Sequence, residues 1–207
     1  MDKLRFTRLW NSLFGIDAKT PAENAWREIA HYYALKDRFY HTGEHITFCL
    51  QQFDEACTHL EAAREVEMAL WFHDIIYQMD SEKNEADSAD FFCQLVGDKQ
   101  NCLKARDRIA SLIMDTTHKS APASIDGRYL ADVDISSLAR PWEEFLQDSL
   151  NVRKESPHLS DVDYKAGQRK FFQSLLNRPH VFYTQYFRQH SEQQARDNLE
   201  KMLTLSI

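Results

Sequence analysis

Trp71-Phe72-His73-Asp74 places an imidazole and a carboxylate side by side within an apolar stretch of the chain. Apolar residues flank the pair, including Leu70 before it and Ile75 after it. Burying an unpaired polar group costs about 1–3 kcal/mol, and burying an uncompensated charge costs more. A divalent metal ion would compensate both groups, because imidazole nitrogen and carboxylate oxygen are ordinary metal ligands. The alternative is a buried histidine bonded to a backbone carbonyl, next to an exposed aspartate.

The pair lies in a segment, residues 61–78, whose apolar residues recur at helical spacing. This spacing predicts a helix in which His73 continues the buried stripe, with Asp74 about 100° further round. A second helix is expected after a polar junction, with Thr42 as its N-cap. His45 would then lie in the first turn of that helix, and His41 just outside it.

The composition favours an all-α protein. Of 207 residues only five are glycine and five are proline, and 43% are hydrophobic, which is enough to form a core. We find no internal repeat and no interdomain linker. We therefore expect a single-domain helical bundle over 1–207, with its core at about 22–140 and C-terminal helices at 141–207 packed on it.

The net charge of −7 argues against a nucleic-acid duplex as partner, because such binding needs a basic surface. Residues 1–150 carry −10 and residues 151–207 carry +3, so an acidic body suits a cation and a basic C-terminal third suits an anion. The four cysteines lack zinc-finger spacing, and Cys49 suits core packing. With an N-terminus too short and polar for a signal peptide or membrane span, we expect a cytoplasmic protein with reduced thiols.

Several histidines and aspartates fall on or beside the predicted apolar faces, and they come from four separate helices. They are His41, His45, His73, Asp74, His118, Asp132 and Asp134. Inward-facing polar groups of a helical bundle meet in its core, where metal sites are built. A metal held there could activate water, because it lowers the pKa of bound water from about 15.7 to about 7.

Four segments carry a resemblance to a known family: Tyr40-His41-Thr42-x-x-His45, Trp71-Phe72-His73-Asp74-x-x-Tyr77, Asn84-Glu85-x-x-Ser88-Ala89 and Asp132-x-Asp134. In this order they resemble the HD superfamily of metal-dependent phosphohydrolases, whose signature is H…HD…D on an all-helical core. The resemblance covers about residues 22–200. It implies a divalent metal (manganese, magnesium, nickel, cobalt, iron or zinc) bound by His45, His73, Asp74 and Asp134. Asp132 is the alternative to Asp134, because both fit the short D-x-D pattern.

The resemblance also implies roles around the metal. His41 is placed like the general-acid histidine of cyclic-nucleotide phosphodiesterases, although Thr42 stands where those proteins have asparagine. A histidine that caps the junction through a hydrogen bond is the alternative. Glu85 is similar to an acidic residue that positions water or substrate in related nucleotidases; alternatively it is an acidic residue favoured at a helix start by the helix dipole. Asp74 is expected to act in catalysis as well as in metal binding.

Substrate contacts are expected from a further set of polar and basic residues: Asn84, His118, Lys119, Arg153 and Arg169. The arginines could bind phosphate bidentately, but most surface arginines only pair with nearby carboxylates. The chain contains no Walker-type glycine loop, so the metal and side chains would hold the phosphates.

The function expected is that of a metal-dependent phosphohydrolase acting on a phosphate ester or anhydride. Its partner would be a small phosphorylated substrate, with a nucleotide first, and a second copy of the chain is an open option; no membrane partner is expected. One alternative is a di-iron HD-fold oxygenase. It needs more metal ligands, so two metals bridged near His118 would favour it. The other is a non-catalytic helical binding module with a structural metal.

Overall fold

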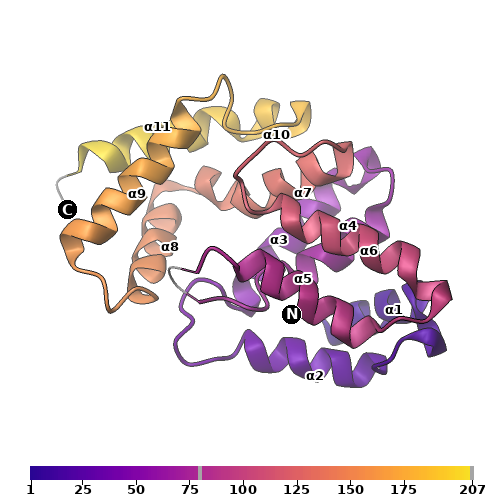
Figure 1. Cartoon of the computed structure of the whole chain (residues 1–207). Helices are drawn as coiled ribbons and strands as arrows, with labels where there is room; N and C mark the ends of the chain where they lie inside the picture. The colour runs from indigo at the N-terminus through magenta and orange to yellow at the C-terminus, as the bar shows by residue number, and fades with distance from the viewer. Residues whose placement is uncertain (79–80, 206–207) are drawn as a thin grey trace.

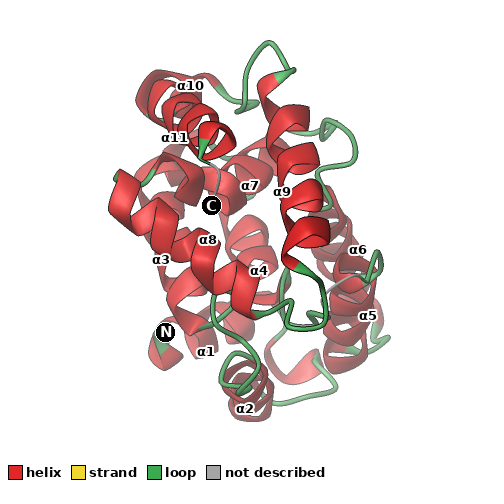
Figure 2. Cartoon of the chain, turned by 90° about the vertical axis from the view of Figure 1, so that its left-hand side faces the viewer, coloured by secondary structure: helices red, strands yellow, loops and turns green. Residues whose placement is uncertain are grey.

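The computed structural model describes residues 1–78 and 81–205, which form helices joined by loops and contain no strand (Figure 1). Figure 2 shows the same helical architecture from the side. The predicted all-α class is confirmed. The α-helices are α1 (Lys3–Leu13), α2 (Ala22–Tyr32), α3 (Gly43–Ala56), α4 (Ala63–Phe72), α5 (Asn84–Val96), α6 (Gln100–Asp115), α7 (Ile125–Ile135), α8 (Trp142–Lys154), α9 (Asp161–Leu176), α10 (Gln185–His190) and α11 (Glu192–Thr204). Short 3-10 helices are η1 (Gly15–Asp17), η2 (Cys57–His59) and η3 (Ser136–Ala139).

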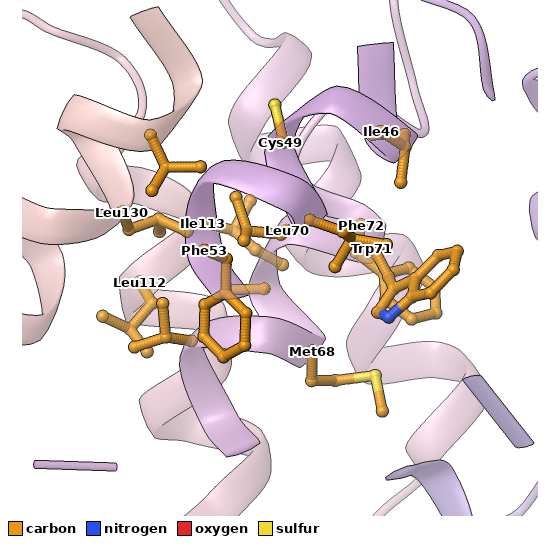
Figure 3. Close-up of a cluster of buried hydrophobic side chains, with 14 of the residues drawn as sticks. Ile46, Cys49, Phe53, Met68, Leu70, Trp71, Phe72, Leu112, Ile113 and Leu130 are labelled. Carbon is orange, nitrogen blue, oxygen red and sulfur yellow. The ribbon is translucent and has the colours of Figure 1, made fainter. Parts of the chain in front are cut away.

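Helix α4 lies at the centre of the hydrophobic core and packs against α1, α3, α6 and α7. All residues from 68 to 72 are completely buried, so the end of this helix is apolar on every side (Figure 3). A helix that is hydrophobic all round is typical of the centre of a protein. The core also includes Phe6 and Trp10 of α1, whose rings lie about 6 Å from the ring of Phe72.

Helix α4 ends at Phe72, so the helix predicted over 61–78 is too long at its C-terminal end. The reason lies in a distant side chain. The guanidinium of Arg38, which is buried, donates to the backbone carbonyl oxygens of Asp74 at 2.8 Å and Ile75 at 2.7 Å. These carbonyls are therefore bonded to a side chain and not to the amides of a further helical turn.

The C-terminal helices are tied to the core through α7 and η3. The carboxylate of Asp132 in α7 accepts hydrogen bonds from the backbone amides of Tyr183 and Thr184, each at 2.7 Å. Asn198 of α11 donates to the carbonyl oxygen of Leu138 at 2.8 Å. In Figure 1, α8, α9 and α11 accordingly lie on one side of the molecule, with α1, α2 and α5 on the other.

Replacing Arg38 by methionine is expected to lower the free energy of unfolding by about 3 kcal/mol, because two buried carbonyls lose a charged donor. Urea unfolding followed by circular dichroism measures this change. Arg27→Met is the matched control, since Arg27 is exposed and donates to Asn24 at the surface. Equal stability losses in the two variants would contradict the role assigned to Arg38.

Candidate metal centre

Four side chains converge in the core from α3, from the segment after α4, and from α7. The Nε2 atoms of His45 and His73 lie 3.3 Å apart. Oδ2 of Asp74 lies 3.1 Å from Nε2 of His73 and 3.4 Å from Nε2 of His45. Oδ1 of Asp134 lies 3.2 Å and 3.5 Å from the same two nitrogens. Ligands bound about 2.1 Å from one ion at tetrahedral or octahedral angles are about 3.0–3.4 Å apart, so the spacing fits a single ion.

The sequence orients both imidazoles locally. The Thr42 hydroxyl accepts a hydrogen bond from the amide of Glu44 at 3.2 Å, which confirms the predicted N-cap and places His45 in the first turn of α3. Nδ1 of His73 lies 2.9 Å from the carbonyl oxygen of Leu70. Since a carbonyl can only accept, Nδ1 carries the proton and Nε2 is left as a potential ligand atom.

Charge compensation dominates the electrostatics of this cluster. Burial lowers the pKa of His73, but the carboxylates of Asp74 and Asp134 outweigh burial and raise that pKa well above its ordinary value. Burial alone would raise the pKa values of both aspartates, but the surrounding histidines, His73 foremost, together outweigh burial and hold these pKa values well below the usual range. A bound cation would replace the imidazole protons in this compensation.

Cys49 joins this group, although its sequence position suggested only core packing. The ligand atoms of His45, Cys49, His73 and Asp134 all lie within 4.8 Å of one another and could hold a metal ion. Sγ of Cys49 lies 3.6 Å from Nε2 of His45, one helical turn earlier. The spacing of four residues between these two side chains was the available signal, because it places both on one helix face.

The two aspartates of the D-x-D pattern point in different directions. Residues two apart on a helix are separated by about 200°, so only one of them can face the cluster. Asp134 does so, whereas Asp132 accepts hydrogen bonds from the amides of Tyr183 and Thr184 and from the Thr184 hydroxyl. Burial raises the pKa of Asp132 to about 6.

His118 holds the outer oxygen of Asp134. Its Nε2 donates to Oδ2 of Asp134 at 2.9 Å, while Oδ1 faces the two cluster imidazoles. The backbone of His118 has a φ of 53°, which is unusual for a residue with a side chain, and its carbonyl accepts from Arg178 at 3.1 Å. By contrast Lys119 is exposed, and its Nζ lies 3.7 Å from Oε2 of Glu82.

A cavity of about 460 Å³ adjoins the cluster, bounded by α7, α8, α9 and the loops before α3 and α5. Its lining includes six residues predicted from the sequence: His41, Asp74, Asn84, Glu85, His118 and Asp134.

His41 is fixed by a carboxylate that the sequence did not single out. Its Nδ1 lies 2.6 Å from Oε2 of Glu155, and its ring stacks on Tyr77 with 3.7 Å between the ring centres. The other oxygen of Glu155 accepts from the backbone amides of Phe39, Tyr40 and His41 at 2.7–3.0 Å. Burial alone would raise the pKa of Glu155, but His41 and the hydrogen bonds from the backbone amides together outweigh burial and lower that pKa. The two residues are 114 positions apart, so no local pattern could pair them.

Asn84 and Glu85 begin α5 and differ in their surroundings. The amide of Asn84 pairs with the backbone of Gln78, donating to its carbonyl and accepting from its N–H, each at 2.9 Å. Glu85 is half-buried in the cavity wall. Burial raises the pKa of Glu85, and the negative charges of Asp74 and Asp134 raise it further.

Neither predicted arginine lies in the lining of this cavity. Arg153 donates to the carbonyl oxygens of Ser156 and Leu159 and to the carboxylate of Asp161. Arg169 donates to the carbonyl of Leu203 at 3.2 Å. Together with Lys119, they are the predicted substrate contacts that the structure does not bring to the site.

No model of a known protein family, no curated protein and no solved structure matches this chain. In the part of the chain that the structure describes, no helix is both long and apolar enough to cross a membrane. The functional argument therefore rests on the site itself.

Asp134→Asn is expected to weaken Mn²⁺ or Zn²⁺ binding by roughly 100-fold or more, because an anionic ligand becomes neutral. Asp132→Asn makes the same change two residues earlier and should leave the metal affinity within about 3-fold. A larger loss would require Asp132 to contact one of the metal ligands. Calorimetric titration of the metal-free proteins measures both values. A similar loss in both variants, or none in Asp134→Asn, would reject Asp134 as the ligand.

Proposed function

We propose that the chain is a metal-dependent phosphohydrolase that cleaves a phosphate ester or anhydride, with nucleotides as the first substrates to test. The observation that carries the proposal is the ligand-like spacing of His45, His73, Asp74 and Asp134 beside a cavity. The order of these residues along the chain is also that of the HD superfamily. Fold alone would not suffice, because one fold hosts many functions.

A divalent ion at this cluster would act as a Lewis acid and lower the pKa of a coordinated water towards about 7. Two imidazoles together with carboxylates favour manganese, iron, cobalt, nickel or zinc over magnesium, which prefers oxygen ligands. Leu70 helps to hold His73 in the required tautomer through its carbonyl oxygen.

His41 is the residue proposed to protonate the leaving oxygen. Glu155 accepts a hydrogen bond from the Nδ1–H group and so stabilises the imidazolium, while stacking on Tyr77 restrains the ring. Because Nδ1 is bonded to Glu155, Nε2 remains to serve a group in the cavity, whose wall includes His41. A general acid must first lie within hydrogen-bond reach of the atom that it protonates, and only then does its pKa affect the rate.

Glu85 is proposed to accept a proton from the attacking water. It lines the cavity with Asp74 and Asp134, and its pKa is raised by burial and by these two charges. A raised carboxylate pKa brings a base closer to the operating pH and makes proton transfer to it more favourable.

A di-iron oxygenase is the second candidate, and one contact favours it. Asp134 presents Oδ1 to the two cluster imidazoles and Oδ2 to His118, so this carboxylate could bridge two ions. The metal content of the purified protein separates the candidates. One ion per chain favours the hydrolase, whereas two irons per chain favour the oxygenase.

Purified protein supplied with manganese, cobalt, nickel, iron, zinc or magnesium is expected to hydrolyse phosphoesters or nucleotides in a general screen. A chelator should abolish the activity, and Asp74→Ala should lower kcat/KM by about 10³-fold or more, since a charged ligand is lost. Asp90→Ala on the exposed face of α5 is the control. Absence of hydrolysis with every metal would favour a binding module with a structural metal over the proposal.

Glu155→Gln is expected to reduce kcat by about 10²-fold with little change in KM, the range typical of losing a general acid. Glutamine keeps an oxygen for the amides of residues 39–41 but places an N–H group against His41 Nδ1. The imidazolium is then destabilised, so the fall in kcat at alkaline pH should move to lower pH.

The matched control for this change is Glu143→Gln, which alters an exposed glutamate at the start of α8. Its pH profile of kcat should overlay that of the wild type. An unshifted alkaline limb in Glu155→Gln would show that Glu155 only supports the loop.

A further inference from the structure

We infer that the cavity takes a substrate that carries one phosphoryl group and an aromatic ring, with no further negative charge. Because it describes the substrate of the proposed hydrolase, this statement rests on the proposed function. It follows from two properties of the cavity wall, its aromatic side chains and the signs of its charges.

Aromatic side chains from four segments line the cavity: Tyr40, Tyr77, Phe145, Tyr164, Phe171 and Phe172. Phe145 of α8 and Phe171 and Phe172 of α9 form a continuous group, with ring centres 6.2 Å apart for Phe145 and Phe172 and 5.9 Å for Phe171 and Phe172. Phe171 still exposes 41% of its surface. An aromatic ligand would cover this surface, and aromatic pairs contribute about 0.5–1.5 kcal/mol beyond the area they bury.

The charged groups of the wall are acidic. Outside the metal cluster the lining contains Glu85, Asp148 and Asp163, and it contains no lysine or arginine among the described residues. Asp148 accepts a hydrogen bond from Arg140 at 2.8 Å, although Arg140 itself does not line the cavity. Glu85 and Asp163 have no such cationic partner in the wall, so a ligand meets two carboxylates there.

The charge balance limits the substrate to one phosphoryl group. A divalent ion held by Asp74 and Asp134 would already be neutralised by these two carboxylates, which leaves the imidazoles of His41 and His118 as the basic side chains of the wall. One phosphoryl group can be accommodated on the ion and His41. A second would lie among Glu85 and Asp163 without a cation, which is unfavourable in a partly dehydrated site.

The dimensions agree with this chemistry. A cavity of about 460 Å³ lies within the range of sites for small organic ligands, which is roughly 300–1,000 Å³. It has room for a ring and a phosphoryl group together.

Four phosphate monoesters test the inference, three of which have the same ring and differ in charge. They are 4-methylphenyl phosphate, 4-carboxyphenyl phosphate, 4-(aminomethyl)phenyl phosphate and glycerol 1-phosphate. Binding to the manganese-loaded protein is measured by calorimetry, and kcat/KM by phosphate release. We expect 4-methylphenyl phosphate to bind at least about 10-fold more tightly than the carboxy ester, because the added carboxylate is repelled by the acidic wall. It should also bind at least about 10-fold more tightly than the glycerol ester, which has no ring to bury. The aminomethyl ester should bind at least as tightly as the methyl ester.

Asp163→Lys adds the missing cation at the exposed start of α9. It should improve binding of 4-carboxyphenyl phosphate by about 5-fold or more relative to 4-methylphenyl phosphate, because only the former carries the second charge. Asp87→Lys is the matched control, since Asp87 is also an exposed acid in the first turn of a helix but lies outside the cavity lining.

The outcomes separate this inference from the proposed function. Tight, charge-selective binding of the aryl esters without hydrolysis by any metal would support the inference and overturn the hydrolase. Hydrolysis with equal or better binding of the carboxy ester, or of the glycerol ester, would overturn the inference and leave the hydrolase standing. Failure of all four esters to bind would overturn the inference.

Discussion

Compensation of buried charge is the constraint on which the rest of this structure depends. His73 is completely buried at the end of an apolar helix, and the carboxylates of Asp74 and Asp134, 3.1 Å and 3.2 Å from its Nε2, balance its charge. Removing one member of such a group leaves the others uncompensated in a medium of low polarity, which is far more costly than never burying them. The positions of α3, α7 and the end of α4 are thereby coupled to one another. A cation has a natural place in this arrangement, because it satisfies all four groups at once.

Two further buried charges hold the loops that carry the site, and both act on backbone groups. Arg38 binds the carbonyls that follow α4 and so ends that helix beside His73. Glu155 gathers the amides of residues 39–41 and at the same time orients the His41 ring. Charge-assisted hydrogen bonds are stronger than neutral ones, which suits them to fixing loops against a rigid helical core.

The C-terminal helices are a working part of the site and not only a cover for the core. The core supplies the cluster that could hold a metal ion, whereas α8 and α9 supply most of the aromatic wall of the cavity. Asp132 links the two parts, because its carboxylate binds the chain at Tyr183 and Thr184 while Asp134, two residues later, faces the cluster. One turn of α7 therefore aligns the cluster that contains Asp134 with the aromatic wall of the cavity, which would receive the organic part of a ligand. Binding energy gained there can position the reacting group.

The sequence by itself determined the all-helical class and the cap at Thr42, because these follow from periodicity and from a local hydrogen bond. It pointed to His45, His73, Asp74 and Asp134 only through a family resemblance, and it did not single out Cys49 as a possible ligand. Only the tertiary structure decided where α4 ends, since the decisive donor, Arg38, is more than thirty residues away. It also decided which aspartate of the D-x-D pair faces the cluster, that Glu155 orients His41, and that Arg153 is bound to backbone carbonyls instead of facing the cavity. Each of these depends on the direction of one side chain towards a distant segment. Helical periodicity specifies which face a residue occupies, but not which groups the folded chain brings to that face.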